Sequence, residues 1–235
     1  MLPTEIHILG DSLARGIVYQ ELRGRYAISR QRCSGALETV LGAKVADHSK
    51  MGATTDDGLL VLEALPPVPD GMCAIEFGGN DCDLDWAYVA EHPEESVRAK
   101  VPLDRFEEQL RRLVGLARVR EMQPVLVSPL PLHAGRYFAW VTRGLNADNV
   151  LRALGDVQAI YRWQERYAIT VARVSRELGT PLFDMRDVFL ARQREYEGLM
   201  CVDGIHPNDE GHRIIAQAAV EAARARYLGG SAQTA

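Results

Sequence analysis

The chain has 235 residues, of which 47% are hydrophobic and 25% are charged. This balance is typical of a globular protein and excludes a disordered chain, and the length allows one large domain or two small ones. The net charge of −5 disfavours a nucleic acid as the main partner, because binding phosphates requires a positively charged face.

Five short apolar runs, most of them rich in β-branched residues, are spread along the chain. Runs of this kind are typical of buried parallel strands. They predict strands at residues 5–9, 43–47, 73–77, 124–128 and 181–183.

Helical patterns lie between these runs. The first helix is predicted by four apolar residues that share one face: Leu13, Ile17, Val18 and Leu22. Thr55 is a predicted N-cap, and Asp104 with Glu107 resembles a capping box. A long helix is predicted over about 157–178, and Asn208 begins the last one.

The alternation of strands and helices predicts one doubly wound α/β sheet, and no linker divides it. We therefore expect a single domain over residues 1–235. Functional loops of such a sheet lie at the carboxyl ends of its strands. Those loops comprise residues 10–13, 49–52 and 78–81.

Ser12 lies where the first predicted strand turns into the first predicted helix. A hydroxyl there is close to free backbone N–H groups, which suits a nucleophile whose attack creates an oxyanion. The alternative is that Ser12 only caps the helix. Asp11 is too close to Ser12 to leave room for a histidine between them, so we expect it to brace the loop.

Asn80 follows two glycines in the sequence Gly78-Gly79-Asn80-Asp81. The stretch matches neither of the glycine-rich nucleotide-binding patterns. The glycines allow the backbone to pass closely, so the Asn80 carboxamide can direct an N–H donor into the space beside Ser12. The alternative is an asparagine that only forms a turn.

Asp81, Asp83 and Asp85 alternate as the first ligands of a calcium loop do. The pattern then fails, because Trp86 occupies the position of the glycine and His92 that of the bidentate glutamate. The H-E-x-x-H motif of zinc proteases is also absent. We expect neither a metal nor any other cofactor.

Asp203 and His206 are three residues apart, ahead of the last predicted helix. A histidine that takes a proton from serine needs a carboxylate to fix its tautomer and stabilise the imidazolium. Both side chains can face the same way on one turn, which Pro207 stiffens. The alternatives are half of a metal site or a pair that only caps the helix.

Together, these blocks resemble the GDSL (SGNH) hydrolases in order and approximate spacing: Gly10-Asp11-Ser12-Leu13, Gly52, Gly78-Gly79-Asn80-Asp81 and Asp203-x-x-His206-Pro207. The resemblance implies a three-layer α/β/α sandwich with a mainly parallel, flavodoxin-like five-stranded sheet. It implies Ser12 as nucleophile, His206 as general base and Asp203 as its partner. It also implies an oxyanion hole formed by the backbone N–H groups of Ser12 and Gly52 and the side chain of Asn80.

Residues 132–167 form a long excursion after the fourth predicted strand, and they contain six of the sixteen aromatic residues in the chain. The segment leaves the sheet at its functional edge. It therefore either forms a lid or wall of the substrate pocket, or packs as a helical hairpin or subunit interface.

The N-terminal sequence has neither a basic region nor a long apolar run, and no stretch has the ~20 apolar residues of a membrane span. We expect a cytoplasmic protein whose four cysteines are free thiols. Its monomeric or homodimeric state stays open.

The expected function is that of a serine esterase that cleaves a small acyl ester, an acetylated sugar or a lysophospholipid through an acyl-enzyme. The alternatives are an acyltransferase or thioesterase of the same fold, and a flavodoxin-like binding protein without turnover.

Overall fold

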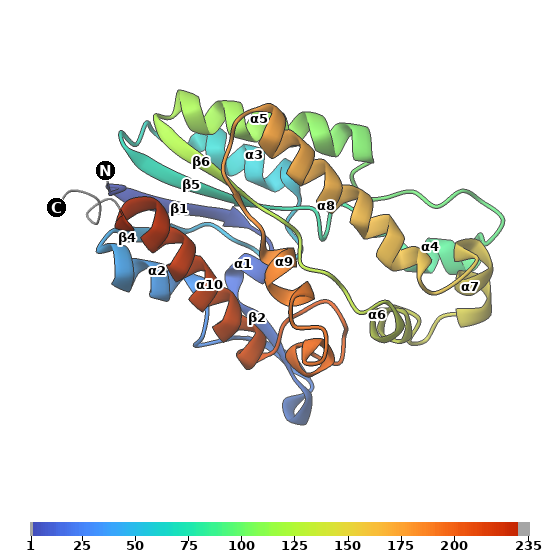
Figure 1. Ribbon diagram of the computed structural model, residues 1–235. Helices are drawn as coiled ribbons and strands as arrows, with labels where there is room; N and C mark the ends of the chain where they lie inside the picture. Colours follow the sequence, from blue (N-terminus) through green and yellow to red (C-terminus); the bar gives the residue numbers. More distant parts are fainter. Residues whose placement is uncertain (1, 230–235) are drawn as a thin grey trace.

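The computed structural model describes residues 2–229 (Figure 1). Its main sheet has five strands, and all neighbouring strands in it are parallel. This confirms the predicted sheet, and each strand lies within two residues of its predicted position. In spatial order the strands are β4 (Lys44–Asp47), β1 (Glu5–Gly10), β5 (Gly71–Glu76), β6 (Met122–Val127) and β7 (Leu182–Phe183).

Helices cover both faces of the sheet and complete the expected three-layer sandwich (Figure 1). One face is covered by α3 (Thr55–Ala64), α5 (Leu103–Val119) and α8 (Ala159–Glu177). The other is covered by α2 (Cys33–Leu41) and α10 (Asp209–Tyr227), with α9 (Met185–Leu190) packed beside α10. The strand order changes direction between β1 and β5, and ligands of such sheets bind in the crevice at that point.

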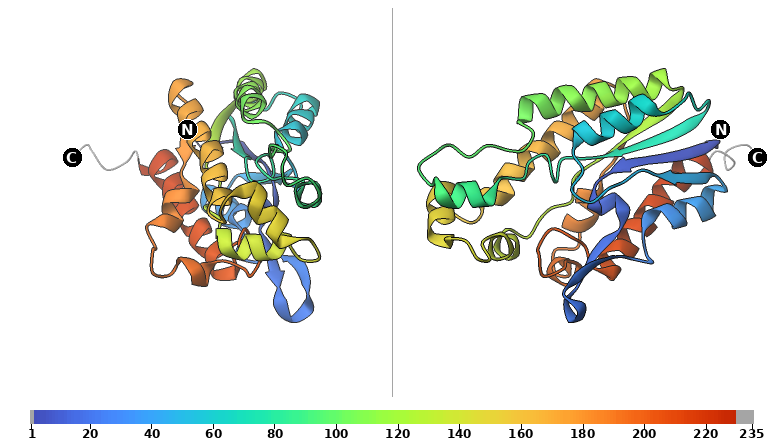
Figure 2. Two further views of the ribbon diagram at one scale, coloured as in Figure 1. Left: turned by 90° about the vertical axis from the view of Figure 1, so that its right-hand side faces the viewer. Right: turned by 180° about the vertical axis from the view of Figure 1, so that it is seen from behind.

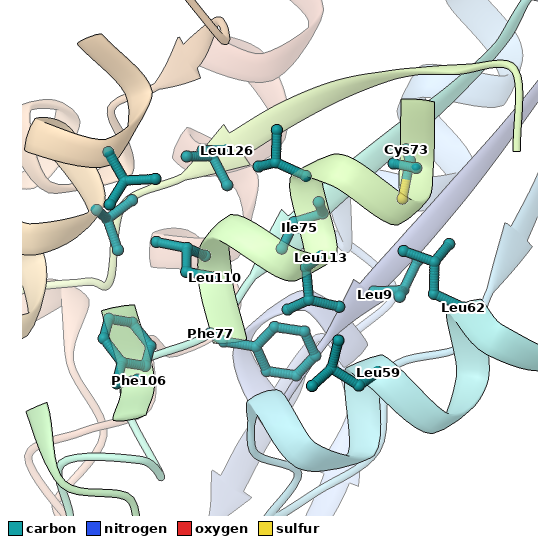
Figure 3. Packing of buried hydrophobic residues seen from close by; sticks show 14 of the residues in the cluster. Leu9, Leu59, Leu62, Cys73, Ile75, Phe77, Phe106, Leu110, Leu113 and Leu126 are labelled. Atoms are coloured by element: carbon teal, nitrogen blue, oxygen red, sulfur yellow. The ribbon is translucent and has the colours of Figure 1, made fainter. Parts of the chain in front are cut away.

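The core follows the alternation of side chains along the central strands. Leu9, Cys73 and Ile75 point towards α3 and α5, where they pack in the largest cluster of buried apolar residues (Figure 3). Ile8 and Met72, next to them in the chain, belong to the cluster beneath α2 and α10. Burial on both sides explains why these strands are continuous apolar runs.

The predicted first helix is wrong beyond its first turn. Helix α1 spans only Ser12–Arg15, because Gly16 adopts the left-handed conformation, with φ of +80°, and ends it. The β-branched residues Ile17 and Val18 then begin a strand, and Leu22 is fully exposed. The segment is an antiparallel hairpin formed by β2 (Ile17–Gln20), the 3-10 turn η1 (Glu21–Arg23) and β3 (Arg25–Ile28).

Two predicted helix starts also need correction. The N-cap of α3 is Thr54 rather than Thr55, and it forms a capping box with Asp57. Helix α5 begins at Leu103 without a side-chain cap. Its Glu107 instead pairs with arginines of α5 and α8, which lowers the pKa of Glu107 to about 2.

The long predicted helix and the last one are confirmed as α8 and α10, and the Asn208 side chain caps α10 by accepting a hydrogen bond from the Gly211 N–H.

The excursion over residues 132–167 comprises α6 (Ala134–Val141), α7 (Ala147–Leu154) and the first turns of α8. Together with α4 (Trp86–Glu91), these helices lie beyond the carboxyl ends of the central strands (Figures 1 and 2). The four cysteines are free thiols, as expected. Within residues 2–229, no helix combines the length and the apolar character that crossing a membrane requires.

Candidate active site

Ser12 is the first residue of α1, directly after the end of β1. The turn between β1 and α1 is so tight that it requires glycine at position 10, since a Cβ there would lie 2.7 Å from the Ala14 Cβ. The Asp11 carboxylate caps α1 by accepting a hydrogen bond from the Leu13 N–H at 2.8 Å. Ser12 is held in a fixed position, and its backbone N–H is one of those that a helix start leaves unpaired within the helix.

Asp203 and His206 lie in the loop between the 3-10 turn η2 (Tyr196–Leu199) and α10. The His206 Nδ1 is 2.7 Å from Asp203 Oδ2, and the His206 Nε2 is 2.8 Å from Ser12 Oγ. The loop therefore brings together side chains that are 194 residues apart in the sequence. Their exposed fractions are 7% for Ser12, 0% for Asp203 and 3% for His206, so water hardly competes for these contacts.

The loop itself requires glycine at position 204. Gly204 has φ of +75°, and a Cβ there would lie 2.7 Å from both the His133 carbonyl oxygen and the Tyr137 nitrogen. The Gly204 carbonyl accepts a hydrogen bond from the His133 N–H at 2.7 Å. The loop that carries Asp203 and His206 is thereby joined to the start of α6.

Asp203 is ionised in this setting. Burial disfavours its charge, but hydrogen bonds from the His206 ring and from the His206 and Ile205 backbone N–H groups outweigh burial and lower its pKa. An ionised Asp203 keeps a proton on Nδ1 of His206, which leaves Nε2 to accept the hydroxyl proton of Ser12. The three side chains thus have the geometry of a serine nucleophile with its general base.

Tyr26, on β3, is part of this arrangement, although sequence reasoning did not identify it. Its hydroxyl donates to Asp203 Oδ2 at 3.2 Å, and its ring packs edge-on against His206 with the centroids 5.2 Å apart. Burial and the neighbouring Asp203 raise the pKa of Tyr26, so the hydroxyl keeps its proton. No motif marks this tyrosine, and the first strand of its hairpin was predicted as part of a helix, so the pairing that places β3 was not foreseen.

Replacing Tyr26 by phenylalanine is expected to lower kcat by about tenfold, since Asp203 loses one of its donors. A lost donor also raises the pKa of Asp203, so the difference between wild type and variant should widen as the pH falls. Tyr19→Phe is the matched control, because Tyr19 packs against Tyr26 and Trp140 from the same hairpin. An equal loss in both variants, without change across the pH profile, would contradict the role of the hydroxyl.

Asn80 lies in the loop after β5 and faces the same space as Ser12. Its Nδ2 donates to Asp11 Oδ2 at 2.9 Å. An amide nitrogen carries two hydrogens, so this bond fixes the side chain and leaves the second N–H to donate elsewhere. Asp11 thus braces two loops, since it holds both the helix that begins at Ser12 and the Asn80 amide.

A second acid lies behind Ser12. Glu76, at the end of β5, is 2% exposed and its Oε2 accepts a hydrogen bond from the Asp11 N–H at 3.2 Å. Burial, and then the neighbouring Asp11, raise the pKa of Glu76 well above its ordinary value. Burial also raises the pKa of Asp11. Glu76 therefore supports the loop that carries Ser12 from behind, in surroundings that favour its neutral form.

The three alternating aspartates have separate structural roles. Asp81 is fully buried and accepts hydrogen bonds from the Thr55 and Gly78 N–H groups, so it joins the loop after β5 to α3. Asp83 accepts from the Trp86 indole, the Tyr137 hydroxyl and the Lys100 ammonium. Asp85 caps α4. In the described part of the chain, no group of three or more acidic, histidine or cysteine side chains is arranged to hold a metal ion.

Gly52 lies in the loop after β4, with φ of +80° in the left-handed region that favours glycine. This loop is joined to the nucleophile strand, because the Lys50 N–H donates to the Gly10 carbonyl at 3.1 Å. Unlike Asn80, Gly52 is not among the residues that line the cavity beside Ser12.

That cavity has a volume of about 220 Å³ and opens on Ser12, Asn80 and His206. Most of its wall is apolar, and residues of the excursion over 132–167 form a large part of it. The excursion is therefore a wall of the cavity next to Ser12, Asn80 and His206. Its contribution comprises Leu132, Tyr137, Ala153, Leu154, Ala159, Ile160, Trp163 and Gln164.

Three solved structures illustrate the likeness to known proteins. A lipase/acylhydrolase from Enterococcus faecalis has a TM-score of 0.65 and 17% identity over 94% of this chain and 96% of its own. A catalytic mutant of an acetylxylan esterase from Geobacillus stearothermophilus has a TM-score of 0.61 and 19% identity over 93% of each chain. An alpha/beta hydrolase from the metagenome of Lake Arreo, Spain, has a TM-score of 0.65 and 19% identity over 94% of each chain.

At these identities the solved structures establish the fold, and no curated protein gives a significant match to the chain. The model of the GDSL-like lipase/acylhydrolase family matches residues 8–214, which contain Ser12, Asn80, Asp203 and His206. The chain therefore belongs to the GDSL-like lipase/acylhydrolase family of ester-hydrolysing enzymes.

Proposed function

We propose that this protein is a serine esterase that cleaves a carboxylic ester through an acyl-enzyme intermediate on Ser12. The observation that carries the proposal is the continuous series of contacts from Asp203 through His206 to Ser12, at 2.7 and 2.8 Å. It ends at a hydroxyl that lines a cavity.

In the acylation step, Ser12 Oγ attacks the carbonyl carbon of the ester while its proton passes to His206 Nε2. The carbonyl π electrons move to the oxygen, which becomes an oxyanion on a tetrahedral carbon. When the tetrahedral intermediate collapses, the bond to the alcohol oxygen breaks and His206 donates the proton to that oxygen. Asp203 stabilises the imidazolium during the step and stays ionised.

The oxyanion receives hydrogen bonds from the backbone N–H of Ser12 and from the second side-chain N–H of Asn80. We assign the third donor to the Gly52 N–H. The Asn80 amide is fixed by Asp11 before substrate binds, and a donor that is already oriented stabilises the developing charge without reorganisation.

In the deacylation step, water takes the place of the alcohol. His206 removes a proton from the water, whose oxygen attacks the acyl carbon, and the Ser12 oxygen leaves with the proton that His206 returns. A sugar hydroxyl or a thiol that reached the same position would accept the acyl group in place of water. Transfer and hydrolysis therefore share the first step, and this proposal concerns hydrolysis.

The test is covalent labelling. A fluorophosphonate reacts with a serine that has an adjacent general base, so we expect one label per chain, located at Ser12 by peptide mass spectrometry. Labelling should proceed in parallel with the loss of activity towards p-nitrophenyl butyrate. A binding protein without turnover predicts no label and no hydrolysis, and that pair of results would reject the proposal.

Removal of metal ions is expected to have no effect on turnover. The nucleophile, the base and the oxyanion donors are all groups of the chain itself, so no step above depends on a bound ion. The measurement is kcat/KM before and after dialysis against EDTA. Loss of activity that one divalent ion restores would contradict this mechanism and would direct attention to Asp81, Asp83 and Asp85.

A further inference from the structure

The cavity beside Ser12 indicates which part of the ester the enzyme selects. Resting on the proposed function, we propose that this cavity holds the acyl group, and that the preferred acyl group is an unbranched hydrocarbon chain longer than acetyl. The proposed substrates of this site are therefore esters of medium-length fatty acids.

The size of the cavity exceeds what an acetyl group needs. Its volume of about 220 Å³ is several times the share of ~30 Å³ that one water molecule has in the liquid. It extends from the reacting side chains to Val97, Leu154 and Trp163. Those three residues pack in the small apolar cluster formed by α4, α7 and the start of α8.

The polar atoms of the wall are almost all engaged within the protein. The Trp163 indole donates to the Cys82 carbonyl at 2.9 Å, and the Tyr137 hydroxyl and Trp86 indole both donate to Asp83. The Gln164 Nε2 donates to the Leu130 carbonyl at 2.8 Å, while its Oε1 has no hydrogen-bond partner. Apart from Ser12, Asn80 and His206, the interior therefore presents mainly carbon atoms and the free Gln164 acceptor.

This lining discriminates between two kinds of acyl or alcohol group. A sugar would lose its hydrogen bonds to water on entry and would find few partners in return beyond the Gln164 acceptor, which is costly. A hydrocarbon chain loses none, and each methylene buried contributes to binding. The cavity thus favours a chain and disfavours a polyol.

The alcohol part of the ester is expected to lie outside the cavity. The alcohol oxygen has to receive its proton from His206 Nε2, and the His206 ring contacts Tyr26 of the hairpin. Tyr26 packs with Tyr19 and Trp140 in a half-exposed aromatic group that does not line the cavity. The alcohol therefore has an open surface beside Tyr26 and His206, while the cavity beside Ser12 remains for the acyl chain.

The first experiment compares p-nitrophenyl acetate, butyrate, hexanoate and octanoate. We expect kcat/KM to rise by about fourfold for each added methylene until the chain fills the cavity. A parallel series varies the alcohol in acetate esters and should show no comparable rise. Highest activity with acetate, or a rise confined to the alcohol series, would overturn the proposal.

A variant that fills the cavity makes the test specific. Ala153 lines the cavity from α7, so Ala153→Phe should lower the ratio of octanoate to acetate activity by about tenfold or more. Leu151, on the same helix, is 37% exposed and does not line the cavity. Leu151→Phe is therefore the matched control and should leave the ratio unchanged. An unchanged ratio in folded Ala153→Phe would overturn the proposal.

A binding experiment without turnover tests the acyl-chain site independently of the esterase activity. Trp86 and Trp163 line the cavity, so tryptophan fluorescence reports its occupancy. In Ser12→Ala, the dissociation constants of ethanol, butanol, hexanol and octanol should fall with chain length, and Ala153→Phe in the same background should abolish the trend.

If no ester is hydrolysed but this trend appears, the esterase proposal fails while the chain site stands. If esters are hydrolysed but neither activity nor alcohol binding depends on chain length, the esterase proposal stands and the acyl-chain proposal is overturned.

Discussion

Replacing Ser12 by alanine is expected to lower kcat for ester hydrolysis by roughly 10⁴–10⁶-fold. The variant has no hydroxyl that can form the acyl-enzyme, so only direct attack by water remains. His206 and the oxyanion donors stay in place, and they account for the residual rate above the uncatalysed reaction. The measurement is kcat with p-nitrophenyl butyrate, on a preparation whose thermal unfolding is recorded at the same time.

The fold should tolerate this change. The Ser12 hydroxyl contacts the His206 Nε2, and both residues line a cavity. Alanine also favours the helical conformation at position 12. Ser34 supplies the matched control, because it lies in the first turn of α2 and is buried to a similar degree, at 6% against 7%. Ser34→Ala should keep the activity of the wild type. More than trace turnover by pure Ser12→Ala would exclude Ser12 as the nucleophile.

Replacing Asn80 by alanine is expected to lower kcat by roughly 10²–10³-fold, the usual loss for one oxyanion donor in a site that excludes water. The contact strengthens as charge accumulates on the former carbonyl oxygen, so it contributes mainly to the transition state. KM should therefore change little. The variant should still react with the fluorophosphonate at Ser12, although more slowly, since the nucleophile and the base remain.

If Asn80 only forms a turn, its replacement is expected to give a different result. Its loss would lower the melting temperature and leave kcat of the folded fraction nearly unchanged, so both quantities have to be measured on one preparation. The bond from Asn80 Nδ2 to Asp11 Oδ2 is lost in either case. A fall in stability alone therefore does not separate the two interpretations, whereas a kcat within a few-fold of the wild type would exclude Asn80 from the mechanism.

The sequence by itself determined the sheet and the edge of it at which the candidate site residues lie. Buried parallel strands are apolar on both faces, so the central strands β1, β5 and β6 were visible as apolar runs, and so were the shorter, half-buried edge strands β4 and β7. The functional loops follow from the strands, because parallel strands end at a common edge. Ser12 and Asn80 could thus be placed near each other, and the order of the motifs added Asp203 and His206.

Local patterns failed where a single residue or a distant contact decided the conformation. The helix predicted from the spacing of Leu13, Ile17 and Val18 did not take Gly16 into account. The left-handed conformation of Gly16 ends α1, and the hairpin begins directly after it. The capping pattern of Asp104 and Glu107 failed because Glu107 pairs with Arg111 on its own helix and Arg173 on α8. The second of these partners is 66 residues away in the sequence, so a local pattern cannot include it.

Only the tertiary structure decided how the candidate site residues are supported and what surrounds them. The contact of Tyr26 with Asp203 spans 177 residues, and that of Asn80 with Asp11 spans 69. The cavity likewise needs α4, α6, α7 and α8 to gather beyond the strand ends, which depends on packing between elements rather than on any one segment. Short motifs record the candidate reacting groups, because the proposed chemistry requires particular residue types. The position and lining of a pocket depend on long-range packing, which many different sequences can satisfy.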